Sequence, residues 1–415
     1  MKKLLFITPE LPYPAQSGGK VKSLKLLKAL SQKYHVTLAC PLKEDDSVHV
    51  EEFHGISPCE NHLHDEVSVA RNASNLALSY ARRVPLNVLR TVSKSLLKRI
   101  AQCADDFDII LLDHYEVMPY LPSNFRGVTI YHAHNAYFKI WERFAQLPGN
   151  PAMRAAAALE ARRVRRYETS VASAVDLTFA APNDAAELIK AGVDKSSIKH
   201  TFHLGDDSQL DLPELRFSQT KKKLMYVGYL GWEANVQGLL WFIDHVWPQI
   251  VLEHPDASFD IVGKNPDKRL QTAALPYHGI TLRGYVADLQ TVYTDSRVSV
   301  APLLFGSGMK VKVLDAMARG MPTVTTSVGA EGINVIAEQH LLIADSPDGM
   351  AENINRLLTD PELWQKLQEN SRWLIRERYT WRQLFTHMHR EIEAVMKQKR
   401  SQAYLSSRST LQHVG

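Results

Sequence analysis

The chain has 415 residues, of which 45% are hydrophobic and 23% charged, and 49 lysines and arginines against 45 acidic residues leave a formal charge of +4. This length exceeds what one hydrophobic core usually organises, so we expect two domains. The small net charge gives no indication of nucleic-acid binding. The cysteines, Cys40, Cys59 and Cys103, lack a Cys-x-x-Cys spacing, which favours a reducing compartment over a zinc site.

The beginning of the chain resembles a signal peptide only superficially. Basic residues precede an apolar run, but that run covers residues 4–7 and falls short of the roughly 7–15 apolar residues that a signal requires. No later segment approaches the ~18 uninterrupted apolar residues of a membrane span. We therefore expect a cytoplasmic protein.

The first half of the chain alternates apolar strands with helices. Residues 3–8 predict a buried strand, and the loop after it ends in Gly18-Gly19 before a lysine-rich helix over 20–33. A glycine pair at a helix start can leave N–H groups open to an anion, although a tight connection is its commoner use. No Gly-x-Gly-x-x-Gly follows this strand, which disfavours a dinucleotide-dependent oxidoreductase.

Two later strands end in polar residues. The strand over 107–113 ends at Asp113, and the strand over 127–132 runs into His132, Ala133, His134 and Asn135. Open parallel sheets bind ligands at the carboxyl ends of their strands. A His-x-His pair can hold a metal, but the sequence offers no evident third ligand. We expect no metal, and either a structural or a ligand-facing role for the histidines.

Basic residues recur on the predicted helices over 20–33, 86–104 and 150–173. Solvated helix faces explain them in the simplest way. Contact with an anionic membrane surface is the alternative, at about 1 kcal/mol for each basic residue near the surface. Residues 206–222 are polar, contain a proline and lack apolar periodicity, which is typical of a linker.

A fresh strand over 223–230 opens the second half. Gly228 allows the backbone to approach a ligand closely. Asn235 stands at the expected start of the next helix, where its side chain either caps free N–H groups or contacts a ligand. The segment Gly284-Tyr285-Val286 ends a later strand, and Tyr285 there is either a core residue or a ligand contact.

Residues 298–332 concentrate the chemistry of this half. A strand over 298–302 leads through a glycine loop into a helix that carries Lys310, Lys312 and Asp315. A loop of small residues before a helix exposes N–H groups and the positive end of the helix dipole, which favour phosphate. Asp315 lies on the same helix face as Lys312, where its carboxylate can accept hydrogen bonds from ribose hydroxyls. This layout predicts a nucleotide-diphosphate site.

The run GSGMKVKVLDAMARGMPTVTTSVGAEG, Gly306 to Gly332, resembles the donor-sugar signature of GT-B-fold retaining glycosyltransferases of the large family-4-like class, the glycosyl transferases group 1. The similarity implies an α/β protein with two doubly wound Rossmann-like domains facing a cleft. We place the acceptor-side domain at 1–205, the linker at 206–222 and the donor domain at 223–378. A crossover helix over 379–398 would return to the first domain, before a mobile tail over 399–415.

The resemblance also implies a role for each candidate residue. In relatives, paired glutamates hold the ribose and touch the donor sugar, and this chain has Asp315 and Ser307 at those two positions. We interpret Ser307 as a change in sugar selection. The expected catalytic residues are His134, Lys310 and Lys312; the donor-binding residues are Gly228, Asn235, Tyr285, Ser307, Gly308, Met309 and Asp315; the residues on the acceptor side of the cleft are Gly18, Gly19, His132 and Asn135.

The expected function is transfer of a sugar from a nucleotide-diphosphate sugar to a carbohydrate or lipid-linked acceptor, in the synthesis of cell-surface polysaccharide or glycolipid. Retention of anomeric configuration follows from the resemblance, as does the expectation of no metal and no cofactor. Association with the inner face of an anionic membrane is compatible with the basic helices. Two alternatives remain open: a nucleotide-sugar epimerase or hydrolase on the same fold, and a catalytically degenerate subunit that binds or scaffolds.

Overall fold

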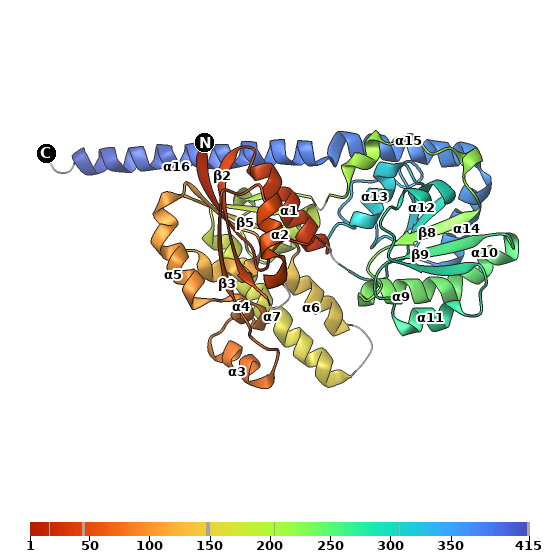
Figure 1. Ribbon diagram of the computed structural model, residues 1–415, viewed down its shortest axis with the longest axis horizontal. Coiled ribbons are helices and arrows are strands. Elements are labelled where there is room, and N and C mark those ends of the chain that lie inside the picture. The colour runs from red at the N-terminus through yellow and green to blue at the C-terminus, as the bar shows by residue number, and fades with distance from the viewer. Residues whose placement is uncertain (16, 44–45, 147–149, 203, 307, 413–415) are drawn as a thin grey trace. The chain divides into compact units, whose positions relative to one another are not determined.

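The computed structural model describes residues 1–15, 17–43, 46–146, 150–202, 204–306 and 308–412, with side chains up to residue 402. The chain divides into two compact units. The first unit combines Met1–Phe202 with Leu384–Gly415, and the second unit is His203–Gln383. Each unit is a parallel sheet flanked by helices, which confirms the predicted fold class (Figure 1).

The first unit contains seven strands in the order β3-β2-β1-β4-β5-β6-β7, and all neighbouring strands are parallel. The order reverses between β1 and β4, and doubly wound sheets bind ligands beyond the strand ends at such a point. The strands are β1 Lys2–Ile7, β2 Tyr34–Leu42, β3 Asn61–Glu66, β4 Ile109–Leu112, β5 Val128–His132, β6 Leu177–Ala180 and β7 Ile198–His200. The helices are α1 Gly18–Leu30, α2 Val50–Ile56, α3 Ala73–Ala81, α4 Leu86–Thr91, α5 Lys94–Cys103, α6 Tyr137–Gln146, α7 Pro151–Ala174, α8 Pro182–Lys190 and α16 Trp381–Gln412.

The second unit repeats this topology with six parallel strands in the order β10-β9-β8-β11-β12-β13. Its strands are β8 Lys223–Val227, β9 Ser258–Val262, β10 Ile280–Gly284, β11 Val298–Ala301, β12 Thr323–Thr325 and β13 Leu342–Ile343. Its helices are α9 Glu233–Trp241, α10 Trp247–Glu253, α11 Lys268–Ala274, α12 Gln290–Asp295, α13 Val311–Arg319, α14 Pro347–Thr359 and α15 Pro361–Arg378. A π-helical turn, Phe242–Val246, joins α9 to α10.

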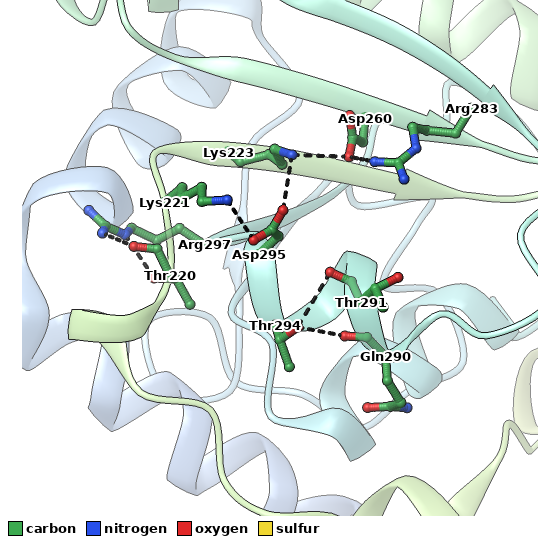
Figure 2. A network of polar contacts seen from close by, with 10 residues as sticks. All are labelled: Thr220, Lys221, Lys223, Asp260, Arg283, Gln290, Thr291, Thr294, Asp295 and Arg297. Atoms are coloured by element: carbon green, nitrogen blue, oxygen red, sulfur yellow. Dashed lines mark hydrogen bonds and ion pairs between the residues drawn. The ribbon is translucent and has the colours of Figure 1, made fainter.

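A polar network ties three strands of the second unit together (Figure 2). Asp260 of β9 is buried and accepts from Lys223 of β8 at 3.3 Å and from Arg283 of β10 at 2.9 Å. Lys223 also lies 3.5 Å from Asp295, at the end of α12. The buried carboxylate therefore has two cations to offset its desolvation, and it fixes the register of β8, β9 and β10.

The segment predicted as a linker is an integral part of the second unit. Leu215 lies in its hydrophobic core. Backbone carbonyls of the segment accept hydrogen bonds from helix side chains: Pro213 from Arg319 at 2.8 Å, and Leu210 from Arg372 at 2.7 Å. Long polar side chains of α13 and α15 thus satisfy an irregular backbone, which explains why the segment shows no periodicity of its own.

The final helix, α16, returns to the first unit as the fold class predicts. It crosses the amino ends of the strands: Lys2 pairs with Glu393 at 2.8 Å, the Tyr34 hydroxyl contacts His389 at 2.9 Å, and Lys399 donates to the Gly127 carbonyl at 2.6 Å (Figure 1).

The tail predicted after 399 is helical to Gln412, because no glycine or proline interrupts α16. In the described part of the chain, no helix is both long and apolar enough to cross a membrane.

Candidate functional site

The glycine loop lies between β11 and α13, where the sequence predicts it. Gly306 and Gly308 have positive φ values of 147° and 70°, which other residues rarely adopt. Ser307, between them, lies outside the described residues. The side chain of Met309 is buried, and a Cβ added at Gly332 would lie 2.8 Å from its Cγ, so Met309 secures the loop by packing. The first turn of α13 has no acidic residue to offset its dipole.

Lys312 lies at the centre of this region. Its ammonium donates to the Tyr226 hydroxyl and to the Asn235 side-chain oxygen, both at 2.6 Å, and lies 4.5 Å from the centre of the Tyr226 ring. Burial, together with the nearby charge of Lys310, lowers the pKa of Lys312 to about 7. A cation that has lost most of its water and has no carboxylate partner in these bonds is well suited to attract an anion.

Asn235 positions Lys312 and does not cap the helix, so the first of the two roles that its sequence position allowed is excluded, while a ligand contact remains a prediction. The residue before α9 is Trp232, which makes no side-chain cap. Asn235 lies inside the helix and is buried; its amide nitrogen donates to the Tyr229 carbonyl at 2.7 Å, and its oxygen accepts from Lys312. Gly228 completes the arrangement, because a Cβ there would lie 2.8 Å from the Tyr226 hydroxyl and 3.2 Å from the Lys312 ammonium.

Lys310 is turned into the loop that precedes it. Its ammonium donates to the Gly308 carbonyl at 2.5 Å and lies 3.7 Å from Glu331. The side chain is 5% exposed. Lys310 therefore stabilises the loop directly and acts on Lys312 through charge.

Asp315 has a contact that its sequence position did not suggest. One carboxylate oxygen accepts from the backbone N–H of Asp206 at 2.6 Å. A Cβ at Gly205 would lie only 2.0 Å from the same oxygen, so the backbone passes directly over the carboxylate. Asp315 thus fastens the start of the second unit to α13. Its predicted contact with a ribose remains a prediction.

Three exposed aromatic side chains follow β8 and β10. Tyr229 is 54%, Trp232 46% and Tyr285 65% exposed, so Tyr285 is not a core residue. The Lys264 ammonium lies 4.3 Å from the centre of the Tyr285 ring. These rings offer flat apolar surfaces beside the glycine loop: the Trp232 ring would lie 3.8 Å from a Cβ at Gly306. The sequence alone does not single out Trp232, because a lone aromatic residue does not reveal its exposure.

A buried carboxylate joins the two histidines of the first unit. Asp113 accepts from His132 at 2.6 Å and from His134 at 2.8 Å through one oxygen, and from the Ser23 hydroxyl at 2.5 Å through the other. Burial alone would raise the pKa of Asp113, but the attraction of His134 and the histidine hydrogen bonds hold it well below its usual value. Asn135 follows, half-buried.

The structure supplies the third ligand that the sequence did not reveal, since one ligand atom each from Asp113, His132 and His134 lies within 4.8 Å of the others. A buried cation nonetheless adjoins them. Lys22, which we placed on a solvated helix face, is 3% exposed, and burial lowers its pKa to about 7 against the attraction of Asp113. Burial and the charge of Lys22 also lower the pKa of His132, to about 3. This positive charge opposes a metal ion, and the absence of a metal remains our expectation.

A cavity of about 200 Å³ opens beside this network. Gly18 begins α1, with Ser17 as its cap, and Gly19 lies on the cavity wall, where a Cβ would be 3.8 Å from His134 Nδ1. The first unit thus brings Gly19 and His134 together at the cavity. The buried His132 does not line the cavity, and it shares one oxygen of Asp113 with His134. The remaining lining residues are Thr8, Pro9, Glu10, Pro12, Lys20, Ser23, Lys43, Asp113, His114, Glu116 and Tyr137.

Known proteins similar to this chain in sequence and in fold include glycosyltransferases. The family model for glycosyl transferases group 1 matches residues 221–360. An uncharacterized 44.6 kDa protein in the cps region of Klebsiella pneumoniae is 24% identical over 403 residues, covering 94% of this chain and all of that protein. The putative glycosyltransferase YtcC of Bacillus subtilis is 24% identical over 419 residues, covering 95% of this chain and 91% of that protein.

The crystal structure of HepE from Anabaena in complex with UDP and glucose aligns with a TM-score of 0.63 at 13% identity, over 95% of this chain and all of that one. At this identity the likeness shows the fold. The family match identifies residues 221–360 as a glycosyl transferases group 1 domain, and the structural likeness shows that the chain has the two-domain GT-B fold.

Proposed function

We propose that the protein transfers a sugar, with retention of configuration and without a metal ion, from a nucleotide-diphosphate sugar to a hydroxyl-bearing acceptor in cell-surface polysaccharide or glycolipid synthesis. One observation carries the proposal: a half-buried Lys312 ammonium is held by Tyr226 and Asn235 beside a glycine loop and the start of α13. The Klebsiella relative is a protein of the cps region, which supports the polysaccharide setting. The HepE complex supports UDP as the first nucleotide to test.

The proposed chemistry is electrostatic. As the anomeric bond breaks, negative charge develops on the leaving diphosphate. Lys312 and the N–H groups before α13 would stabilise that charge, each well-placed donor contributing about 3 kcal/mol. Lys310 would hold the loop in shape. A divalent ion has no step in this scheme, and His134, oriented by Asp113, would contact the transferred sugar.

A donor screen tests this function. We expect at least one nucleotide-diphosphate sugar to be consumed slowly by the purified protein without acceptor and without added metal, and its nucleoside diphosphate to raise the melting temperature. Binding with no consumption of any donor would favour the degenerate scaffold. Donor consumption that is as fast without an acceptor as with one would favour the epimerase or hydrolase. A melting temperature that no nucleoside diphosphate changes would refute the donor site itself.

We further propose that the protein docks on an anionic membrane surface through the α6–α7 hairpin, where its acceptor would reside. The helices lie side by side (Figure 1). They expose Ile140 at 42%, Phe144 at 42%, Met153 at 58% and Leu159 at 47%. Exposed arginines stand among these apolar side chains: Arg154, Arg162 and Arg166. Apolar side chains interleaved with cations match the chemistry of an anionic lipid surface.

Vesicle flotation tests the docking surface. We expect the full chain to float with phosphatidylcholine vesicles that contain about 30% phosphatidylglycerol, to bind less in high salt, and to ignore neutral vesicles. The double variant Phe144→Glu/Met153→Glu should lose most of this binding. Leu252→Glu, at a residue that is 83% exposed in the second unit, should retain it. Equal flotation of both variants, or none by the wild type, would contradict the proposal.

A further inference from the structure

The cavity of the first unit contains a polar group that the scheme above does not use. His114 has a φ of 138°, a backbone conformation that non-glycine residues rarely adopt. Its ring is 5.0 Å from the Tyr115 ring and 4.5 Å from the Tyr137 ring, measured between centres. The residue is 6% exposed, and its buried Nδ1 has no hydrogen-bond partner among the described residues. A strained backbone thus holds, in the lining of the cavity, a histidine with one unsatisfied nitrogen.

Glu116 lies within ion-pair distance of that nitrogen. Its carboxylate lies 3.8 Å from His114 Nδ1 and is 14% exposed. No residue in the described part of the chain donates a hydrogen bond to it. Burial raises the pKa of Glu116 to about 7, so near neutral pH its carboxyl group can either donate or accept a hydrogen bond. Two adjacent polar groups therefore line the cavity without partners that satisfy them.

The charges around the cavity select against an anionic ligand. Both lining lysines are already paired, Lys43 with Glu10 at 2.7 Å and Lys20 with Asp46 at 3.0 Å. Asp113 carries a negative charge nearby, which the buried Lys22 offsets in part, and Glu116 adds negative charge when ionised. The start of α1 would attract phosphate on its own, but a phosphate here would face these carboxylates. A ligand with hydroxyl groups and no charge avoids this repulsion.

We propose that this cavity binds a neutral, hydroxyl-rich ring of monosaccharide size, with Glu116 and His114 hydrogen-bonding two of its hydroxyls. A hydroxyl both donates and accepts, so it satisfies the carboxyl group and the imidazole alike. The volume of about 200 Å³ is below that of pockets for drug-sized ligands, which favours a single ring. Only the identification of this ring with the terminal sugar of the acceptor rests on the proposed function.

Saturation-transfer NMR on the full chain tests the inference. The probes are the methyl glycosides of glucose, galactose, mannose and N-acetylglucosamine, with inorganic phosphate and glycerol 3-phosphate as anionic competitors. We expect at least one glycoside to bind and neither anion to displace it. Glu116→Gln removes the charge and keeps the shape, and should weaken that glycoside about tenfold. His114→Asn keeps a residue that tolerates positive φ and should weaken it similarly.

The matched control is Asp105→Asn, at an exposed carboxylate of the same unit outside the cavity, which should bind as the wild type does. Binding by none of the glycosides, displacement by phosphate, or unchanged affinity in both cavity variants would overturn the inference. Nucleoside-diphosphate binding is measured on the same samples. If it is absent while a glycoside binds, the proposed donor chemistry fails and the ring-binding cavity stands; the opposite pattern rejects the cavity alone.

Discussion

Replacing Lys312 with methionine is expected to lower the rate of donor cleavage by about 100- to 1,000-fold, the usual effect of removing one well-placed donor to a developing negative charge. Methionine keeps the length of the side chain, so Tyr226 and Asn235 keep a neighbour of similar shape and the fold should persist. Affinity for the nucleoside diphosphate should fall as well. The measurements are release of nucleoside diphosphate from the donor and isothermal titration calorimetry.

Lys312 also gives ligand binding by the wild type a characteristic pH dependence. The pKa of Lys312 is lowered to about 7, chiefly by burial. A bound diphosphate favours the charged ammonium, so the pKa rises in the complex and binding takes up a proton above pH 7. The wild type should therefore bind more weakly as the pH rises above about 7, and calorimetry at about pH 8 in buffers of different ionisation enthalpy should detect the uptake.

Lys312→Met should lose this proton uptake together with activity, whereas Lys268→Met should lose neither. Lys268 is an exposed lysine of α11 in the same unit. Its replacement by methionine removes the same charge from a position outside the glycine loop. A Lys312→Met protein that cleaves donor at the wild-type rate, or that still takes up a proton on binding, would remove Lys312 from the site.

Short sequence patterns predicted the glycine loop before α13 and the strand over 127–132, because each depends on residues that are neighbours in the chain. The glycine loop is followed directly by α13, which begins at Val311, as predicted. The strand over 127–132 was recognisable because buried parallel strands are continuously apolar. His132, the last residue of this strand, and His134, just beyond it, lie at the carboxyl end of the sheet, as the topology requires.

The partners of those residues could not be predicted, because they come from distant parts of the chain. Tyr226 is separated from Lys312 by 86 residues, and its position in a buried strand identifies it only as a core aromatic. Lys22 appeared solvated because it follows the lysine spacing of α1, yet its neighbour in space is Asp113. From its position alone Asn235 could be either a helix cap or a ligand contact, and only the fold reveals the lysine that it holds.

Elements with weak apolar patterns were missed for a related reason. Strand β3, NHLHDE, lies at the edge of its sheet and has no fully buried residue, so it lacks the alternation by which strands are recognised. The helix expected over 86–104 is two helices. Ser93 separates them, because its hydroxyl caps Leu96 at 3.1 Å while its N–H donates to the Tyr120 hydroxyl at 2.8 Å.

Replacing Asp113 with asparagine is expected to reduce sugar transfer on the order of 100-fold, the lower range of what a positioned acid–base group contributes. One carboxylate accepts hydrogen bonds from His132, His134 and Ser23, and it faces the buried Lys22. An amide can accept at one end only, so one of these donors would meet an N–H group. His134 would lose its fixed orientation, and Lys22 would lose the stronger of its two attractions to carboxylates.

The effect should fall on the rate constant and leave the donor nucleotide's affinity unchanged, since the variant lies in the first unit and Lys312 in the second. A pH–rate profile separates this role from general destabilisation. Without Asp113 the pKa of Lys22 should drop further below 7, because burial remains while the attraction is lost, so the profile should shift and not merely scale down. Asp105→Asn should change neither rate nor profile. A variant whose rate falls only in proportion to its folded fraction would reduce Asp113 to a structural residue, and His134 would then need another source of orientation.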